Sequence, residues 1–426
     1  MNYFNHYKDI LLEEVMPALG CTEPIAIALA AAKAREVLGE EPEKATVLCS
    51  GNIIKNAKSV IVPNSNGHRG IEIAAALGIL SGESEKGLKV LENVKDEEIQ
   101  RAEKVAKKII HVQFVEGIEG LYIVVKLRKG DKTATVELKE DHSHFHSIEK
   151  DGQYLIAPPK LDLESSEKNK EEEIFSLEKI LNFANSINLE DHQDLVDLLD
   201  QQIEYNMAIA KEGLTEDYGV SIGRTLLKYN DENSPKIRAR AAASAASDAR
   251  MGGCSLPVMI NSGSGNQGIT VSVPVISYAE HLQSSKDKLY RALIVSNLIG
   301  IYQKKYIGKL SAFCGVVTAA AAAGAGIGYL MDFTNGEIEN TIINTVATTG
   351  GMVCDGAKAS CASKISIAVE NAVSALQMAQ NHKVFESGEG IVGSSADDTI
   401  RNIGQMAKMG MQATDIEILN IMLEQK

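Results

Sequence analysis

The segment LSAFCGVVTAAAAAGAGIGYLM, residues 310–331, decides the fold class of the C-terminal part of this chain. Its 22 residues carry no charge, and a helix of that length could span a bilayer. Alanine and glycine dominate the segment, however, and these residues gain little free energy from contact with lipid. We therefore expect a buried helix that packs closely against other helices through small side chains.

The rest of the C-terminal part follows the same pattern. Ala-rich helical stretches recur at 237–250, 287–304 and 364–380, with Gly-rich breaks between them. Aromatic residues make up only 5 % of the chain and tryptophan is absent, so the core must be built mainly from small and aliphatic side chains. The sequence predicts an all-α, Ala/Gly-rich domain over residues 174–426.

The N-terminal part reads differently. A helical pattern over residues 4–38 is broken at GCTEP, where Thr22 can cap a helix that opens with Glu23-Pro24. Residues 45–53 read as a strand, and alternating apolar residues on both sides of a turn at Gly130-Asp131 predict a β-hairpin. We expect an α+β domain with a small, mainly antiparallel sheet over residues 1–160, joined by a charged linker at 161–173.

Charge and cysteine usage restrict the function classes. The formal net charge of −14 disfavours nucleic acid and anionic membranes as partners. The N-terminus has no uncharged apolar stretch of the kind that signals export, and the chain has only six cysteines. These features predict a cytoplasmic protein, in which cysteines serve as ligands, nucleophiles or inert core residues rather than as disulfides.

Three cysteines of the helical part lie among small residues. Cys314 is in the opening segment, and Cys354 and Cys361 are in GGMVCDGAKASCASK, residues 350–364. Small neighbours would let the backbone approach an inorganic cluster, and three thiolates fit a [4Fe–4S] cluster with one iron not ligated by protein. Inert buried cysteines remain the alternative. Six residues lie between Cys354 and Cys361, and this spacing is not a standard metal-binding motif.

Cys21 stands at the start of a predicted helix. A helix N-terminus favours the thiolate and lowers the pKa of a cysteine, which predicts a reactive thiol. An inert, packed thiol is the alternative. Cys49 and Cys254 have no comparable setting, and we interpret them as structural.

Two polar loops could bind a small anion. The loop INSGSGNQG, residues 260–268, mixes a flexible backbone with hydroxyl and amide groups and can form an anion-binding nest. Its candidate substrate-binding residues are Ser262, Ser264, Gly265, Asn266, Gln267 and Gly268. The second loop, VPNSNGHRG at 62–70, contributes Asn64 and Arg69 as candidates. On a strand, His142, His144 and His146 of DHSHFHS would share one face and resemble a metal triad, but an exposed edge strand explains the alternation as well.

Taken together, these residues resemble the L-cysteine desulfidase family, iron–sulfur relatives of the L-serine dehydratases. The resemblance covers nearly the whole chain. It is carried by GCTEP at 20–24, KNAKSVIVPNSNGHRG at 55–70, NSGSGNQG at 261–268 and the three cysteines of the helical part, in this order. The short spacing between the last two cysteines favours the desulfidases over the dehydratases.

The resemblance implies an α,β-elimination that converts L-cysteine to pyruvate, ammonia and hydrogen sulfide. It implies that Cys314, Cys354 and Cys361 bind a [4Fe–4S] cluster, that Cys21 is the catalytic thiol, and that the loop at 264–268 holds the carboxylate of the amino acid. We also expect a homo-oligomer, most simply a dimer.

Three other functions stay open from the sequence. An L-serine dehydratase would release pyruvate and ammonia from L-serine. A pyridoxal-phosphate lyase would need a Schiff-base lysine such as Lys358 or Lys364, but neither is accompanied by a phosphate loop. A non-catalytic cluster protein would bind a small amino acid without turnover.

Overall fold

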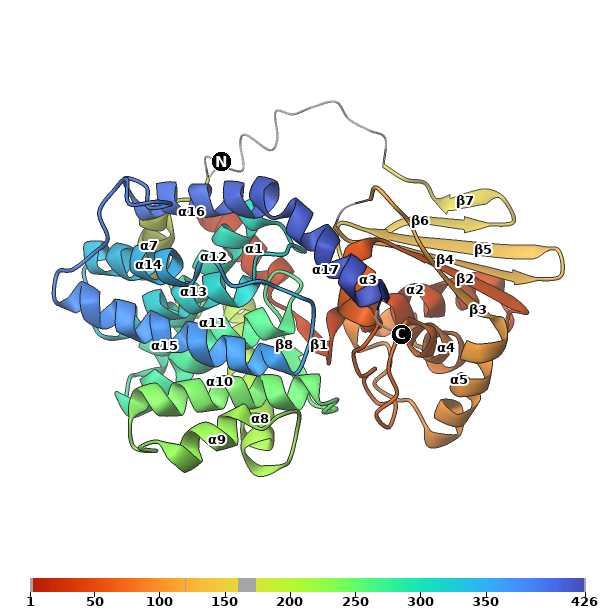
Figure 1. The fold of residues 1–426 in the computed structure, drawn as a ribbon, viewed down its shortest axis with the longest axis horizontal. Helices are drawn as coiled ribbons and strands as arrows, with labels where there is room; N and C mark the ends of the chain where they lie inside the picture. Colours follow the sequence, from red (N-terminus) through yellow and green to blue (C-terminus); the bar gives the residue numbers. More distant parts are fainter. Residues whose placement is uncertain (1–2, 119, 160–173, 425–426) are drawn as a thin grey trace.

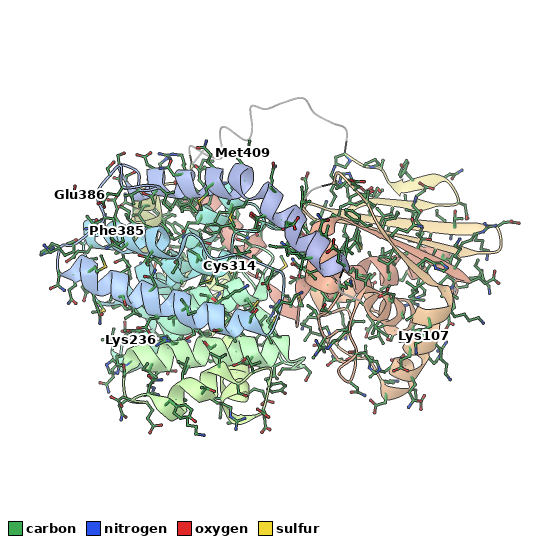
Figure 2. All side chains as sticks on the ribbon, viewed as in Figure 1. Lys107, Lys236, Cys314, Phe385, Glu386 and Met409 are labelled. Atoms are coloured by element: carbon green, nitrogen blue, oxygen red, sulfur yellow. The ribbon has the colours of Figure 1, made fainter. Side chains whose placement is uncertain are left out.

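The computed structural model describes residues 3–118, 120–159 and 174–424. Figure 1 shows a half built around a β-sheet beside a larger helical half. A small mixed sheet combined with many helices makes this an α+β protein, as predicted. In Figure 2, charged side chains such as Lys107, Lys236 and Glu386 lie at the periphery, whereas Cys314 lies inside the helical half.

The sheet has six strands in the order β3-β2-β4-β5-β6-β7. Their bounds are β2 (Lys44–Cys49), β3 (Ile110–Phe114), β4 (Tyr122–Lys129), β5 (Lys132–Lys139), β6 (Phe145–Lys150) and β7 (Gln153–Ile156). Only the pair β2–β3 is parallel, so the prediction of a mainly antiparallel sheet is confirmed. The predicted hairpin is β4–β5, in which Val125 lies opposite Val136. Both side chains are buried, which fixes the register of the hairpin.

One predicted boundary in this half is wrong. The strand expected over 45–53 ends at Cys49, and Ser50 precedes a helix, α3 (Gly51–Ala57). The Ser50 hydroxyl donates to the carbonyl of Gly120 (2.6 Å), which ties the end of β2 to the loop before β4. The helical turn places Asn52 and Lys55 so that they face the C-terminal segment of the chain.

Helices cover the sheet on the side of α2, which packs against β4 and β5. The helical elements of this half are α2 (Thr22–Leu38), α4 (Ile71–Ser81), η1 (Ser84–Lys89) and α5 (Asp96–Ile109). At the contact of α2 with α4, a Cβ on Gly78 would lie 2.8 Å from the Cα of Ala28. Only glycine permits this close approach, so the small residues of α2 and α4 let the two helices pack closely.

The helical half contains most of the remaining elements. They are α7 (Leu177–Ser186), η2 (Leu189–Asp191), α8 (Gln193–Thr215), α9 (Ile222–Tyr229), α10 (Pro235–Met251), α11 (Gly265–His281), α12 (Lys286–Ile307), α13 (Gly315–Leu330), α14 (Asn335–Thr349), α15 (Ser360–Gln380), α16 (Ala396–Gln405) and the π-helical turn η3 (Met406–Gly410).

Helix α13, from the opening segment, lies at the centre of this half and packs against α11, α12, α14 and α15. A Cβ on Gly326 would lie 3.0 Å from Ser296 Cβ and 3.0 Å from Val275 Cγ2, so larger residues would push α11 and α12 away. The predicted buried small-residue helix is confirmed. Within the described ranges, no helix combines the length and the apolar character that crossing a bilayer requires.

The two ends of the chain cross between the halves. Helix α1 (Tyr3–Glu14) packs into the helical half, where the Tyr7 and Phe175 rings are 5.1 Å apart. Helix α17 (Gln412–Glu424) packs back against α3. A short ladder, β1 (Pro17–Leu19) with β8 (Pro257–Met259), adds a further connection. The domain division at residue 160 stays a prediction, and the predicted linker, 161–173, lies outside the described residues.

Candidate functional site

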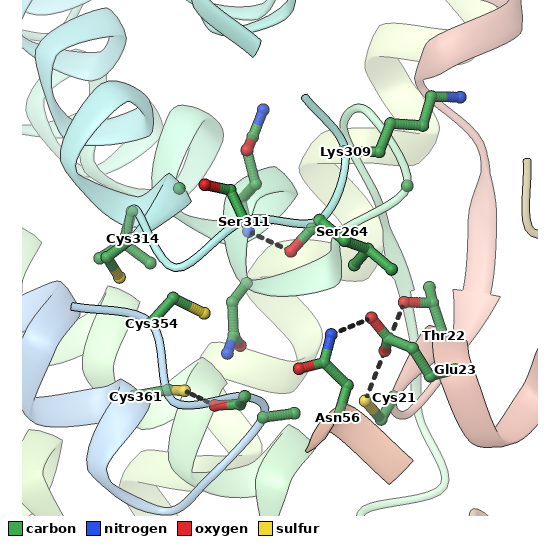
Figure 3. Close-up of a pocket in the computed structure, with 18 of the residues that line it drawn as sticks. Cys21, Thr22, Glu23, Asn56, Ser264, Lys309, Ser311, Cys314, Cys354 and Cys361 are labelled. Carbon is green, nitrogen blue, oxygen red and sulfur yellow. Dashed lines mark hydrogen bonds between the residues drawn. The ribbon is translucent and has the colours of Figure 1, made fainter. Parts of the chain in front are cut away.

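A pocket lined by both halves collects four of the six cysteines: Cys21, Cys314, Cys354 and Cys361. Figure 3 shows the last three on one side of the pocket and Cys21 with Glu23 on the other. The helical half therefore contributes one wall, and the start of α2 contributes the wall that faces it.

Backbone pairing brings two of the cysteine segments together. Phe313 and Val353 form an isolated antiparallel bridge. On either side of it, the amide of Cys354 donates to the carbonyl of Ala312 (2.7 Å) and the amide of Cys314 donates to the carbonyl of Met352 (3.1 Å). These bonds hold Cys314 and Cys354 next to each other although helices α13 and α14 separate them in sequence.

The third cysteine comes from the start of a helix. Cys361 lies in the first turn of α15, and its Sγ accepts a hydrogen bond from the amide of Lys358 (3.4 Å). Gly356, which has a φ of +93°, turns the chain between the last two cysteines. A Cβ at Gly356 would lie 2.6 Å from the carbonyl oxygen of Lys55, so this turn rests directly on α3.

The charges around these thiols favour a thiolate at Cys354. A hydrogen bond from the Cys314 thiol, together with the cations of Lys55 and Lys304, lowers the pKa of Cys354 to about 6 against the effect of burial. The same hydrogen bond, together with burial, raises the pKa of Cys314. Because a thiolate is the form that binds metal, the pocket supplies one soft anionic ligand before any metal is bound.

The space beside the three thiols is kept open by a glycine. Gly315 begins α13, and a Cβ there would lie 3.0 Å from Gln267 Oε1 and 3.4 Å from Lys304 Nζ. Gln267 Oε1 is buried and has no hydrogen-bond partner within the described part of the chain. The pocket therefore holds polar groups whose bonding capacity the protein itself leaves unused.

These features decide which kind of metal group the residues fit. Among the residues that the structure describes, no three His, Cys, Asp or Glu side chains gather closely enough for a single metal ion. The three cysteines instead stand around a pocket bordered by glycines and by the cation of Lys304. An iron–sulfur cluster takes one thiolate at each ligated iron, and cations compensate its negative charge. This donor set is compatible with a cluster bound through three cysteines.

Glu23 is the buried acid of the opposite wall. Its Oε2 accepts hydrogen bonds from the Cys21 thiol (3.1 Å) and the Thr22 hydroxyl (3.1 Å), and its Oε1 accepts one from Asn56 Nδ2 (2.8 Å). Burial by itself would raise the pKa of the Glu23 carboxyl, but the nearby His142 ring and the donors of Cys21 and Asn56 hold the pKa well below its usual range. The His142 Nε2 is 3.8 Å from Glu23 Oε1, which is longer than a hydrogen bond.

The structure corrects the prediction for the protonation of Cys21. Cys21 itself is the N-cap of α2, in place of Thr22, so the thiol does stand at a helix N-terminus. Burial and the negative charge of Glu23 nevertheless raise its pKa well above the ordinary value. The effect of the helix dipole, a fraction of a charge, is outweighed, and Cys21 rests as a thiol that donates to Glu23.

The glycine-rich loop lies where α11 begins. Ser264 is the N-cap of α11, and its hydroxyl accepts from the amide of Gln267 (3.3 Å). Ser264, Asn266 and Gln267 line the pocket, as does Gly263. The predicted amide donors are partly engaged already, because Gln267 Nε2 donates to Asn261 Oδ1 (2.9 Å).

Three other predicted residues of this loop are not among the pocket-lining residues. Ser262 is buried and donates to Asn261 Oδ1 (3.0 Å). Gly268 packs against a neighbouring segment, where a Cβ would lie 2.8 Å from the backbone of Ile260. Gly265 lies against Arg250, where a Cβ would lie 2.6 Å from the guanidinium carbon. These residues shape the loop around the pocket.

The second predicted loop does not reach the pocket. Asn64 donates to the carbonyl of Leu91 (2.9 Å), and Arg69 donates to the carbonyl of Ser59 (2.9 Å). Both side chains thus connect backbone segments of the sheet half. The alternating histidines do not share a strand face either, since β6 begins only at Phe145; His142 lies in the preceding bend.

Sequence reasoning missed several pocket residues that tertiary structure supplies. They are Glu23, Asn56, Arg250, Lys304, Lys309 and Ser311. One signal was available: Arg250 and Lys304 are cations within helical stretches rich in small or apolar residues, where a charged residue requires a reason. Cys49 and Cys254 are buried and do not line the pocket, in keeping with their interpretation as structural.

Comparisons with known proteins show which family this chain belongs to. A family model described as the serine dehydratase alpha chain matches residues 85–420, a range that includes the loop before α11 and the three cysteines of the helical wall. A protein of Lachnoclostridium phytofermentans is 50% identical over 417 residues, which cover 97% of this chain and 98% of its own. A protein of Desulfitobacterium hafniense is 48% identical over 424 residues, which cover 99% and 97%. Both relatives carry the name UPF0597 protein, which states no reaction.

Proposed function

Since this chain belongs to the serine dehydratase alpha chain family, we propose that it is an iron–sulfur-dependent lyase that eliminates the β-substituent of a small L-amino acid. Its substrate is L-cysteine, which reacts with water to give pyruvate, ammonia and hydrogen sulfide. The observation that supports this most strongly is the convergence of three cysteines and Cys21 on one pocket from opposite walls.

Cys314, Cys354 and Cys361 would hold a [4Fe–4S] cluster. When bound through three thiolates, such a cluster supplies a Lewis acid at the iron that the protein does not ligate. The choice of L-cysteine follows from softness, because a thiolate leaving group matches iron in a sulfur environment better than a hydroxyl does.

The wall that faces the cysteines supplies the acid–base groups. We assign removal of the α-proton to Cys21, the thiol of this wall. Cys21 must first lose its own proton, and the Glu23 carboxylate, 3.1 Å from the sulfur, is positioned to accept it. Because the pKa of Cys21 is raised and the pKa of Glu23 is lowered, this proton transfer is uphill. Its cost is part of the barrier that the enzyme must overcome.

The substrate carboxylate is bound at the start of α11. The loop residues Ser264 and Asn266 line the pocket there, and the first amides of α11 are directed to the same end of the helix. Loss of the α-proton and of the β-thiolate leaves aminoacrylate. This product tautomerises and hydrolyses to pyruvate and ammonia without further catalysis.

The test is sulfide and pyruvate release from L-cysteine by anaerobically purified protein. We expect both products in equal amounts from the wild type. Cys354→Ser should lose iron and activity together, whereas the matched control Cys254→Ser, at a buried cysteine that does not line the pocket, should keep both. A wild-type protein that contains iron but releases no sulfide from L-cysteine would contradict the proposal.

L-serine dehydration is the second candidate, because the matching family model bears that description. The same preparation distinguishes the two activities. If L-serine gives pyruvate with a higher kcat/KM than L-cysteine, the protein is a dehydratase and the assigned substrate is wrong.

A further inference from the structure

Arg250 is a buried cation that the mechanism above does not use. It lies in the last turn of α10, is only 4% exposed and lines the pocket. Its Nε has no hydrogen-bond partner in the described part of the chain, and no carboxylate there forms an ion pair with the guanidinium. Burying an unpaired charge is costly, so this arrangement indicates that an anion from outside the chain completes it.

The position of the guanidinium identifies where that anion binds. A Cβ on Gly265, the first residue of α11, would lie 2.6 Å from Arg250 Cζ and 2.9 Å from Nη2. Glycine is thus required for the guanidinium to lie against the first turn of this 17-residue helix. The positive end of the helix and the planar cation meet at one point, next to the pocket-lining Ser264.

We propose that Arg250 and the first turn of α11 form a carboxylate subsite that requires a free α-carboxylate in every substrate of this enzyme. A guanidinium presents paired N–H donors that match the two oxygens of a carboxylate. The substrate class is therefore small amino acids with an unmodified carboxylate, and the decarboxylated or amidated forms are excluded. This inference rests on the proposed function and names how the same site selects its substrate.

The experiment measures equilibrium binding of L-alanine and L-alaninamide by calorimetry to the anaerobically purified, iron-loaded protein. L-alanine has no leaving group, so binding is separated from turnover. In the wild type we expect L-alanine to bind roughly 10- to 100-fold more tightly than L-alaninamide, the range for a charge-assisted hydrogen-bonded pair. In Arg250→Ala this preference should disappear, and in Arg250→Lys, which keeps the charge without the fork, it should be partly retained.

Two further variants separate a direct role from a structural one. Gly265→Ala, which displaces the guanidinium from α11, should weaken L-alanine binding as Arg250→Ala does. Arg240→Ala is the matched control on the same helix, because Arg240 pairs with Glu370 outside the pocket, and it should bind like the wild type. Methylguanidinium added to Arg250→Ala should restore L-alanine binding, a rescue that a merely destabilised protein would not show.

Each result of these binding experiments either supports or overturns the carboxylate subsite. Equal binding of L-alanine by the wild type and Arg250→Ala, or no preference for L-alanine over L-alaninamide in the wild type, overturns the carboxylate subsite and leaves the lyase proposal untouched. Loss of iron from Arg250→Ala at unchanged fold also overturns it, because Arg250 would then serve the cluster. Arg250-dependent binding of L-alanine by a wild type that releases no sulfide supports the subsite while the proposed function fails.

Discussion

Replacing Lys55 with methionine removes a buried cation where three segments meet. The Lys55 side chain is 2% exposed and pairs with Asp415 of α17, and its Nζ is 3.4 Å from the carbonyl oxygen of Cys354. Its own carbonyl accepts a hydrogen bond from Lys358 Nζ (3.1 Å). Lys55→Met keeps the length of the side chain but leaves Asp415 without its cation. The variant therefore tests whether this ion pair joins α17 to the cysteine loop.

The size of the effect follows from the burial of the two partners. Removing one partner of a fully buried pair costs about 3–5 kcal/mol. Asp415 is 20% exposed and keeps a hydrogen bond from Asn52, so it regains part of its hydration. We therefore expect Lys55→Met to lower the free energy of unfolding by about 2–3 kcal/mol, below that range. The matched control is Lys33→Met, whose pair with Glu36 is about one-third exposed on both sides and should contribute about 0–1 kcal/mol.

The assay is guanidinium-induced unfolding of the anaerobically purified proteins, followed by circular dichroism. A double-mutant cycle with Asp415→Asn isolates the pair: the double variant should lose less stability than the sum of the two single variants, because no orphaned charge is left. Additive losses, or a Lys55→Met protein as stable as Lys33→Met, would refute the assigned role of the pair.

The remaining predictions concern protonation and the catalytic wall. Cys21→Ala should keep its iron and lose sulfide release by at least about 100-fold, the lower range for a general base; normal turnover would remove Cys21 from the mechanism. Glu23→Gln removes the charge that raises the pKa of Cys21, so alkylation of the Cys21 peptide in the iron-free protein should begin at lower pH, and an unchanged pH profile would contradict the assigned contact. Burial raises the pKa of Asp248 from 3.8 to about 6. The folded state therefore binds this proton more tightly than the unfolded state does. Because of this difference, the contribution of Asp248 to the free energy of unfolding falls as the pH rises between those two values. Asp248→Asn should flatten the pH dependence of the unfolding midpoint in that window, and a slope identical to the wild type would count against the burial effect.

Local patterns predicted the elements that local interactions determine. In α13 the run of alanine and glycine, and in β4–β5 the alternation of apolar residues, indicate which side chains are buried. These local patterns were therefore sufficient to predict both elements. The end of β2 at Cys49 was not predicted, because the polar contacts of Asn52 and Lys55 with α17, which favour a helix there, join residues far apart in sequence. The packing of α1 into the helical half depends on aromatic contacts far apart in sequence, which no window of residues contains.

The candidate site was likewise predicted only in part. The small neighbours of Cys314, Cys354 and Cys361 already grouped these residues as a candidate cluster site, and the resemblance implied the same ligand set. The position of Cys21 at a helix N-terminus was correct, but the direction of its pKa shift was wrong, because burial and the Glu23 carboxylate depend on the packed pocket. Arg250 was missed although a cation in an Ala-rich helical stretch was a signal, because its Nε is seen to lack a partner only in the folded, described chain.

The most direct test of the central claim is the content of iron and acid-labile sulfide in protein purified without oxygen. We predict about four of each per chain in the wild type and in Cys254→Ala, the composition of a [4Fe–4S] cluster. Cys314→Ala, Cys354→Ala and Cys361→Ala should each retain far less, while remaining folded. Iron-free wild-type protein after anaerobic purification and reconstitution, or full iron content in all three pocket variants, would contradict the account.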